Sequence, residues 1–406
     1  FRRAGRSCQT PSKNASRRSR FARTISHVGD GIALVALVLL VQESEGTGTA
    51  VGVLLLASSL PRFLGPLAGV VADRVEQRTL MVLCDVGNAA IFATISWSRP
   101  SFGVLLALVA ASAVLDTLFA PAGRSAVPAL VDGDDLLRAN AWMGTSLNLQ
   151  VALGTLLGGT LVAAIGVRGA LAFDAVSFAA SALLLVGLPP LRSTSTGTPA
   201  GFLAVGREGL SFAWRTRVVR RFLIVLFLGV AFAAVDNVAL VFLVRETLGG
   251  GPVAFGLVSA AFGVGMISAS LGLSIRRTSV AVTTLLIVAW LASGFGTVAT
   301  GLAPLIVVAA LAQAVGGFGN GLENIAADTL IQQAVPREML GRVFGLVTTA
   351  AFGGSTLAYA AGGPLLDLSS PRAVFLIAGA GILAVTAYLW FALRDAASPD
   401  HPTQPG

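Results

Sequence analysis

Histidine, lysine and cysteine are almost absent from this chain of 406 residues. It contains two histidines, two cysteines and a single lysine, Lys13, and only 12% of its residues are charged. Lys13 is followed by Asn14, which excludes a Walker A phosphate loop. Two histidines and two cysteines do not suffice for a zinc cluster, a disulfide framework or most histidine-based triads. We therefore expect no enzyme, no cofactor and no metal site.

Apolar residues are abundant instead. They make up 55% of the chain, and the mean hydropathy is +0.81. Because a crossing takes about 20 apolar residues, the chain has room for about a dozen helices in a membrane. The net charge of +8 is spread over connections without interleaved aromatic residues, which favours membrane topology over nucleic-acid binding. We predict an all-α membrane protein without a nucleic-acid partner.

Twelve apolar runs separated by polar residues predict twelve transmembrane helices. They lie at 23–42, 49–71, 79–97, 102–120, 141–165, 169–188, 220–244, 253–275, 280–300, 303–325, 343–365 and 373–393. Alternate connections, beginning with the N-terminal segment, hold 23 of the 28 basic residues. Since basic residues concentrate in cytoplasmic segments, both termini are expected to be cytoplasmic.

The N-terminal segment 1–22 is rich in arginine and serine and has no acidic residue. A transit peptide or a degraded twin-arginine signal remains an alternative reading. We favour a disordered tail attracted to anionic lipids, because the following apolar stretch carries Asp30 and no small-residue cleavage site. Phe1 is not an initiator methionine, so we expect the natural chain to begin elsewhere. Residues 394–406 form a second predicted cytoplasmic tail.

An internal repeat relates the two halves of the chain. VALVLLVQES at 35–44 and VALVFLVRET at 238–247 share seven of ten residues at an offset of 203. The repeat predicts two parallel-related halves of six helices, at 23–188 and 220–393. Such duplicated halves are typical of alternating-access transporters with a site near the middle of the membrane.

The predicted connection between the halves, 189–219, begins with a polar stretch. Its second part places Phe202, Val205, Leu210 and Trp214 on one face of a helix with arginines beside them. This pattern predicts an interfacial helix on anionic lipids, with an unstructured loop as the alternative.

The stretch from Gly69 to Arg78, GVVADRVEQR, resembles the GxxxDRxxxR signature of the major facilitator superfamily. Segments 119–141, 154–166 and 335–345 resemble its enterobactin-exporter and macrolide-efflux branch. The resemblance implies the twelve-helix major facilitator fold in a bacterial inner membrane, and we expect a monomer. Glu76 stands where the signature has glycine, and Thr155 where the antiporter motif of that superfamily has proline.

The same resemblance implies a gate on the cytoplasmic side. Its signature residues are Gly69, Asp73, Arg74 and Arg78. Arg74 would contact Asp116, while Asp73 would face the start of the eleventh helix. A proton site is the alternative role for Asp116.

Ionisable side chains inside the membrane cost about 3 kcal/mol each on insertion scales, so they should face a cavity or a partner. Asp236 lies ten residues before Glu246, about 15 Å from the outer face. Asp30 and Asp236 are candidates for binding protons or a substrate cation; a structural ion pair or a polar contact in helix packing is the alternative. Arg62 and Glu323 are further candidates for the coupling or substrate site. Arg62 would pair with Asp30 or with Asp85, and a static brace is the alternative role of that pair. Glu323 would pair with Arg276 or Arg277.

Small residues recur at equivalent places in both halves, at Gly154, Gly158, Gly159, Gly362 and Gly363. Such surfaces allow close helix packing. A pivot for rocking between the halves is the sharper interpretation.

These observations predict a secondary transporter that exports a small amphipathic molecule, such as a siderophore or a macrolide-like drug, in exchange for protons. An importer or a lipid flippase of the same fold is the alternative. A non-transporting sensor or assembly partner is an alternative of another class, but the tail and the connection are too short for a soluble output domain.

Overall fold

The protein is a bundle of long helices. The computed structural model describes residues 13–98, 100–130, 148–188, 202–275 and 281–397. Its helices are α1 (Lys13–Glu45), α2 (Gly48–Ser59), α3 (Gly65–Arg74), α4 (Gln77–Ser98), α5 (Phe102–Leu130), α7 (Thr155–Val186), α8 (Phe202–Arg215), α9 (Arg217–Ala233), α10 (Asp236–Phe242), α11 (Pro252–Ile275), α12 (Val282–Leu302), α13 (Ile306–Ala334), α14 (Leu340–Asp367) and α15 (Pro371–Ala397). The described residues form ten helical stretches long and apolar enough to cross a membrane.

Several predicted crossings are interrupted. The expected helix at 49–71 is divided into α2, a 3₁₀ segment at Leu60–Leu64 and α3, because Pro61 and Pro66 cannot donate the hydrogen bonds of a continuous helix. The expected helix at 220–244 is divided between α9 and α10 just before Asp236. α1 begins at Lys13, ten residues earlier than predicted, so part of the expected disordered tail is helical.

A sharp bend lies within the stretch Gln150–Val186. Gly166 has φ 74° and ψ 169°, a conformation that is essentially restricted to glycine. Residues before it follow the predicted crossing 141–165, and residues after it follow the predicted crossing 169–188. The stretch therefore contains two helical arms. The part of the first crossing before residue 148 lies outside the described residues.

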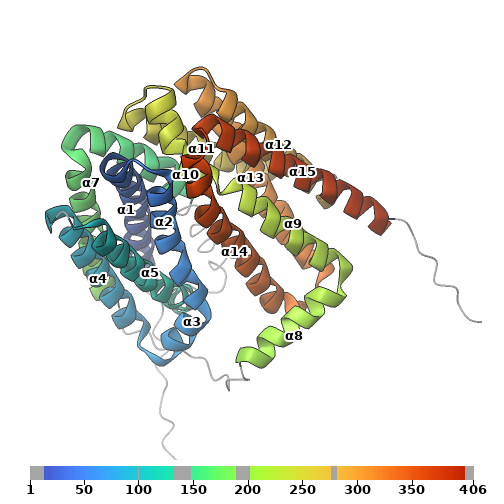
Figure 1. Cartoon of the computed structure of the whole chain (residues 1–406). Coiled ribbons are helices and arrows are strands. Elements are labelled where there is room, and N and C mark those ends of the chain that lie inside the picture. Colours follow the sequence, from blue (N-terminus) through green and yellow to red (C-terminus); the bar gives the residue numbers. More distant parts are fainter. Residues whose placement is uncertain (1–12, 99, 131–147, 189–201, 276–280, 398–406) are drawn as a thin grey trace, which may run out of the picture.

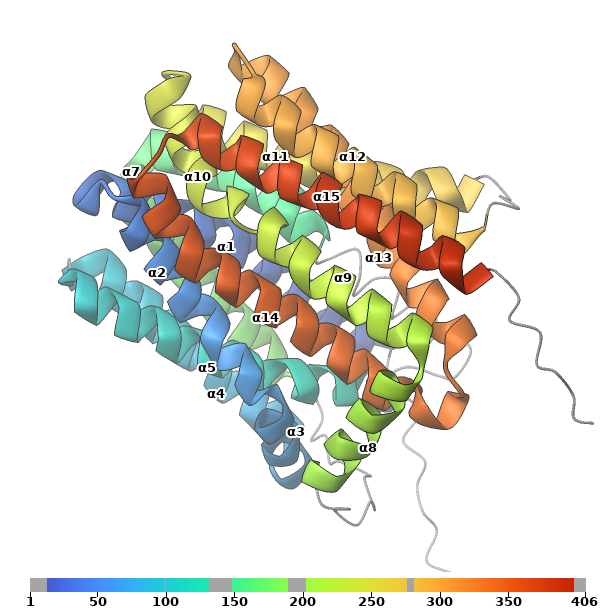
Figure 2. The same cartoon turned by 45° about the vertical axis from the view of Figure 1, so that its right-hand side comes forward.

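The two halves lie side by side, with α1–α7 on one side and α9–α15 on the other (Figures 1 and 2). We call the end that carries the turns at 46–47, 166, 248–251 and 303–305 the joined end, and the opposite end, with Arg74 and α8, the split end. At the joined end one apolar core contains buried residues of both halves, among them Val41, Val51 and Val244. At the split end the cores are separate: one surrounds Met81 in the first half and another surrounds Phe222 in the second.

Glycine allows the closest helix contacts between the halves. A Cβ added to Gly159 of α7 would lie 2.4 Å from the carbonyl oxygen of Pro252 and 2.9 Å from Cα of Gly256 on α11. On the other side of the bundle, a Cβ on Gly363 of α14 would lie 2.6 Å from Cα of Thr49 on α2. Without a hydrophobic driving force between helices in lipid, such backbone-to-backbone packing is the main source of contact energy.

The repeat is visible in the packing as well. Ser96 at the end of α4 donates a hydrogen bond of 2.9 Å to the carbonyl oxygen of Arg168. In the second half, Arg372 donates hydrogen bonds of 3.0 Å to the carbonyl oxygens of Gly301 and Ala303 at the end of α12. Arg168 and Arg372 are 204 residues apart, so each half fastens its last crossing to its third at equivalent places.

Candidate functional site

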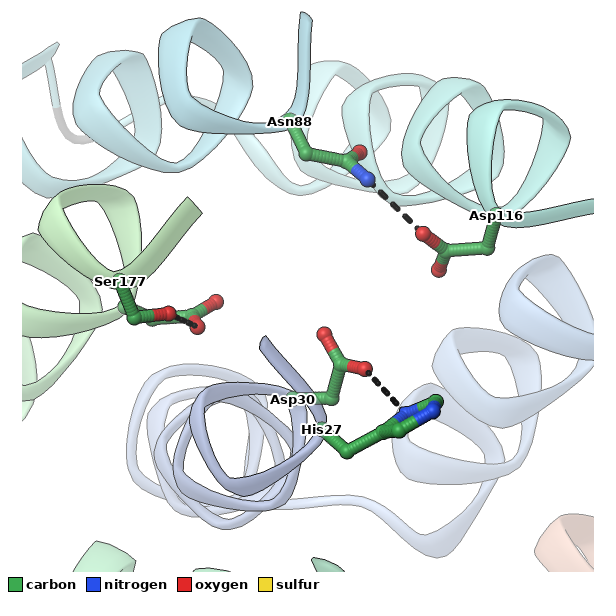
Figure 3. A network of polar contacts seen from close by, with 6 residues as sticks. His27, Asp30, Asn88, Asp116 and Ser177 are labelled. Atoms are coloured by element: carbon green, nitrogen blue, oxygen red, sulfur yellow. Dashed lines mark hydrogen bonds and ion pairs between the residues drawn. The ribbon is translucent and has the colours of Figure 1, made fainter. Parts of the chain in front are cut away.

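Acidic side chains of α1 and α5 lie near one another in the first half (Figure 3). Asp30 of α1 lies 3.5 Å from Nδ1 of His27. Asp116 of α5 accepts a hydrogen bond of 2.8 Å from the side-chain amide of Asn88 on α4. The carboxylates of Asp30 and Asp116 point into the same space and interact electrostatically. Asn88 is buried but Asp116 is accessible, so the pair borders an opening rather than a sealed core.

Asp174 of α7 is a third member of this group. Its side chain is fully buried and accepts a hydrogen bond of 3.0 Å from Ser177 Oγ. It packs on α1 at Gly29, where an added Cβ would lie 2.2 Å from Asp174 Oδ1. Since Asp30 follows Gly29 in the chain, Asp174 also interacts electrostatically with Asp30. Asp174 lies near the start of the predicted crossing 169–188, toward the outer face of the membrane, so its sequence position did not indicate a contact with Asp30.

Arg62 lies where the two halves meet. Its guanidinium carbon is 5.5 Å from the ring centre of Phe352 on α14, which is within the range of a cation–π contact. The predicted ion pair with Asp30 is not formed between these two described side chains, since Asp30 contacts His27 instead. The break between α2 and α3 explains the difference, because it changes the direction of the side chain relative to a straight helix.

Asp236 directly follows the break between α9 and α10 in the second half. It is the first residue of α10, and the preceding Ala234 and Val235 end the α9 segment. Asp236 is partly accessible, whereas its repeat counterpart Ala33 is buried in α1. Tyr359 of α14 interacts electrostatically with both Arg62 and Asp236. The ionisable groups of the two halves thus approach one another across α14.

The signature residues have different surroundings from those expected. Arg78 donates a hydrogen bond of 2.8 Å from Nη1 to the carbonyl oxygen of Leu188, at the end of the first half. Arg74 is exposed, and Asp116 is bonded to Asn88 rather than to Arg74. The side chain of Asp73 lies outside the described part of the structure. Among the described residues, a Cβ on Gly69 would meet nothing within 4 Å.

Glu323 of α13 is buried and accepts a hydrogen bond of 3.5 Å from Asn320. Its expected partners, Arg276 and Arg277, lie outside the described residues. Among the described residues, no three or more His, Cys, Asp or Glu side chains are grouped so that they can hold a metal ion.

The glycines predicted from the repeat are all at helix contacts. Gly154 lies against Gly31 of α1, and Gly158 lies against Ile32 and Val35. Gly362 faces Val235 within the second half. Gly159 and Gly363, in contrast, lie between the halves, on opposite sides of the bundle.

The geometry is that of a carrier: two related helical halves share a core at one end, and partly accessible ionisable side chains lie in both halves. The chain belongs to the transmembrane secretion effector family of the major facilitator superfamily, whose pattern matches residues 11–404. It is a transporter of small molecules and a multi-pass membrane protein, not an enzyme.

Individual relatives agree with this family. The chain is 26% identical over 370 residues to the multidrug efflux pump Tap of Mycobacterium tuberculosis, covering 88% of each chain. It is 25% identical over 382 residues to the enterobactin exporter EntS of Citrobacter koseri, covering 92% of this chain and 90% of the exporter. Its fold is similar to the crystal structure of the nucleoside transporter NupG, with a TM-score of 0.73 at 13% identity over 94% of this chain and 99% of NupG.

Proposed function

We propose that the protein is a proton-coupled efflux transporter that works by alternating access. The observation that carries this proposal is the core that the halves share at the joined end, set against the separate cores of each half elsewhere. Two halves packed in this way can rock about their contacts, because the described residues of the split end form no core that the halves share. Efflux as the direction is supported by the likeness to an efflux pump and an exporter.

The proposal includes twelve crossings, two more than the ten apolar helical stretches of the described residues. The stretch Gln150–Val186 supplies two of them, separated at Gly166, and α2 with α3 supplies another across its proline-containing break. The halves are then residues 23–188 and 220–393. Both termini and the split end face the cytoplasm of a bacterial cell, since the basic connections lie at that end.

In this arrangement the acids and Arg62 are the coupling and substrate site. Asp116 is exposed and Asp30 and Asp236 are partly accessible, and an ionised carboxylate at membrane depth is costly unless it meets a proton or a cation. Proton binding from the outside would neutralise these acids and favour the return of the empty carrier. Release of the proton to the cytoplasm would restore a negative site for an amphipathic substrate.

The glycine contacts between the halves are proposed as the pivot. Gly159 and Gly363 face the opposite half through backbone atoms, so the helices can roll there while the helix ends beyond these glycines separate. α8 is proposed to lie on anionic lipids: Leu210 is 49% and Trp214 60% exposed, and Arg207 and Arg215 are exposed beside them. Nothing in this mechanism requires more than one copy of the chain.

Transport into everted membrane vesicles tests the proposal. With an acidic interior, vesicles that contain the protein should accumulate members of a panel of amphipathic antibiotics and siderophores, and Asp236→Asn should abolish substrate-dependent proton movement. The matched control is Glu338→Gln, which removes an exposed acid outside the site. Proton movement unchanged in Asp236→Asn would exclude this residue from coupling. Accumulation only with the opposite gradient would favour an importer, and movement of labelled phospholipid instead of the panel would favour a flippase.

A further inference from the structure

The joined end is closed by two hydrogen-bonded pairs that are related by the internal repeat. Arg245 Nη1 lies 2.9 Å from Glu43 Oε1, and Gln42 Nε2 donates a hydrogen bond of 3.0 Å to Glu246 Oε1. At the repeat offset of 203, Gln42 corresponds to Arg245 and Glu43 to Glu246. Each pair is therefore the image of the other under exchange of the halves. We call these four side chains the clasp.

A third contact fastens the same end on one side. Asp367, the last residue of α14, accepts hydrogen bonds from the backbone N–H groups of Gly48 and Thr49 at 2.6 and 3.0 Å, and from Thr49 Oγ1 at 2.5 Å. These donors are the free N–H groups at the start of α2, which a carboxylate satisfies well. A Cβ at Gly48 would lie 2.8 Å from Leu366, so the two helix ends are in direct contact. We call this contact the Asp367 cap.

We infer that the clasp and the Asp367 cap form the gate of the joined end, and that their side chains set the ratio between the two open states. The gate side chains are positioning residues, since none of them lies beside Arg62 or the site acids Asp30, Asp116 and Asp236. This inference rests on the proposed alternating access, in which the joined end must open once in each cycle.

The chemistry of the contacts supports a gate rather than a permanent brace. Glu43 is 46% and Arg245 23% exposed, so both groups are hydrated again when they separate, and the cost of opening them is small. Directly beneath, Val41 and Val244 are fully buried, and their exposure to water would be unfavourable. Polar contacts at the rim thus provide a closing force that is easily reversed, while the apolar layer below makes the seal.

Two pairs of spin labels can test the inference by measuring distances. One pair, at Ser101 and Leu305, lies on exposed turns of the joined end in opposite halves; the other, at Val75 and Gln333, lies on exposed positions of the split end. All four are introduced as cysteines in a chain with Cys8→Ser and Cys84→Ser. Opening of the joined end should lengthen the first distance and shorten the second in the same fraction of molecules.

Two single substitutions should shift this fraction. Glu43→Gln should raise the population open at the joined end about two- to fivefold, the range expected for an exposed ion pair. Asp367→Asn should raise it about tenfold, because it weakens several charge-assisted hydrogen bonds. The matched control Glu45→Gln removes an exposed charge from the same helix end without touching the clasp and should leave the fraction unchanged. Glu43→Arg combined with Arg245→Glu should restore the wild-type fraction.

A bulky substitution at the contact between Gly159 and Gly256, which we call a wedge, distinguishes failure of the gate from failure of the proposed function. This contact lies on the other side of the bundle from the Asp367 cap. Gly159→Leu places a side chain against Gly256 and should open the joined end independently of the clasp; Gly256→Ala is the milder version if folding suffers. If neither wedge changes either distance, alternating access is wrong, and the gate with it. If a wedge opens the joined end while Glu43→Gln and Asp367→Asn do not, the gate inference alone is overturned. A longer joined-end distance without a shorter split-end distance would mean local fraying and would also overturn it.

Discussion

At the scale of single residues, the close contact between α1 and α7 depends on the absence of one Cβ. Gly29 leaves room for Asp174 and Ser177, since an added Cβ would lie 2.2 Å from both Asp174 Oδ1 and Ser177 Oγ. The buried carboxylate has no space to move away, because the Asp174 side chain is fully buried. This glycine thereby fixes the distance between Asp174 and the neighbouring Asp30.

We predict that Gly29→Ala lowers the free energy of unfolding by about 1–3 kcal/mol, the usual cost of an overpacked site. Thermal unfolding of the purified protein in detergent measures the effect. Gly103→Ala is the control, because its Cβ would meet nothing within 4 Å and alanine favours the helix there. Equal melting temperatures for the two variants would show that α1 and α7 are packed less tightly than the structure indicates.

Helix interruptions position the charged residues at the scale of secondary-structure elements. Arg62 lies in the segment between α2 and α3, and Asp236 begins α10 after the break that follows α9. A straight helix would direct these side chains by its regular 100° rotation per residue. The break before α3 leaves Arg62 against Phe352 of the opposite half, and the break before α10 leaves Asp236 near Tyr359 of its own half. The proline at 61 is a signal in the sequence for the first break; no comparable residue precedes Asp236.

The turn at Gly166 provides a test at this scale. Its backbone conformation, φ 74° and ψ 169°, is strained for any residue with a Cβ, and Gly166→Ala should cost about 1–3 kcal/mol of stability. A steric clash is not the cause of this loss of stability, since no described atom lies within 4 Å of the added Cβ. Melting temperatures compared with those of Gly272→Ala, an equally open position within α11, isolate the backbone contribution. A variant as stable as this control would mean that the two arms of Gln150–Val186 are joined differently.

At the scale of the whole molecule, the proposed orientation in the membrane rests on the arrangement of basic residues. If the split end is cytoplasmic, a cysteine at Ser101 should react with a membrane-impermeant maleimide added to intact cells. A cysteine at Val75 should react only after the membrane is opened. Both positions are exposed, so differences in burial do not explain a difference in labelling. Labelling of Val75 in intact cells would reverse the orientation proposed here.

Much of the architecture follows from the chain alone. Scarce charge and long apolar runs require helices in lipid, because backbone groups there must be satisfied within each segment. The repeat at 35–44 and 238–247 specifies two related halves, and the connection 202–215 forms the helix α8 that its pattern predicts. The stretch from Gly69 to Arg78 identified the superfamily to which the chain belongs.

Tertiary structure alone decided which charges meet. Arg62 faces Phe352 rather than Asp30, Asp116 bonds to Asn88 rather than to Arg74, and Asp174 packs on Gly29. The hydrophobic periodicity of the sequence shows which residues share a face of a straight helix. It does not show the tilt of the helix, its breaks or the depth at which a neighbouring helix crosses it. The clasp illustrates both sides: the repeat made Gln42 and Arg245 equivalent in the sequence, and only the packing of the two halves brought each against a glutamate of the other.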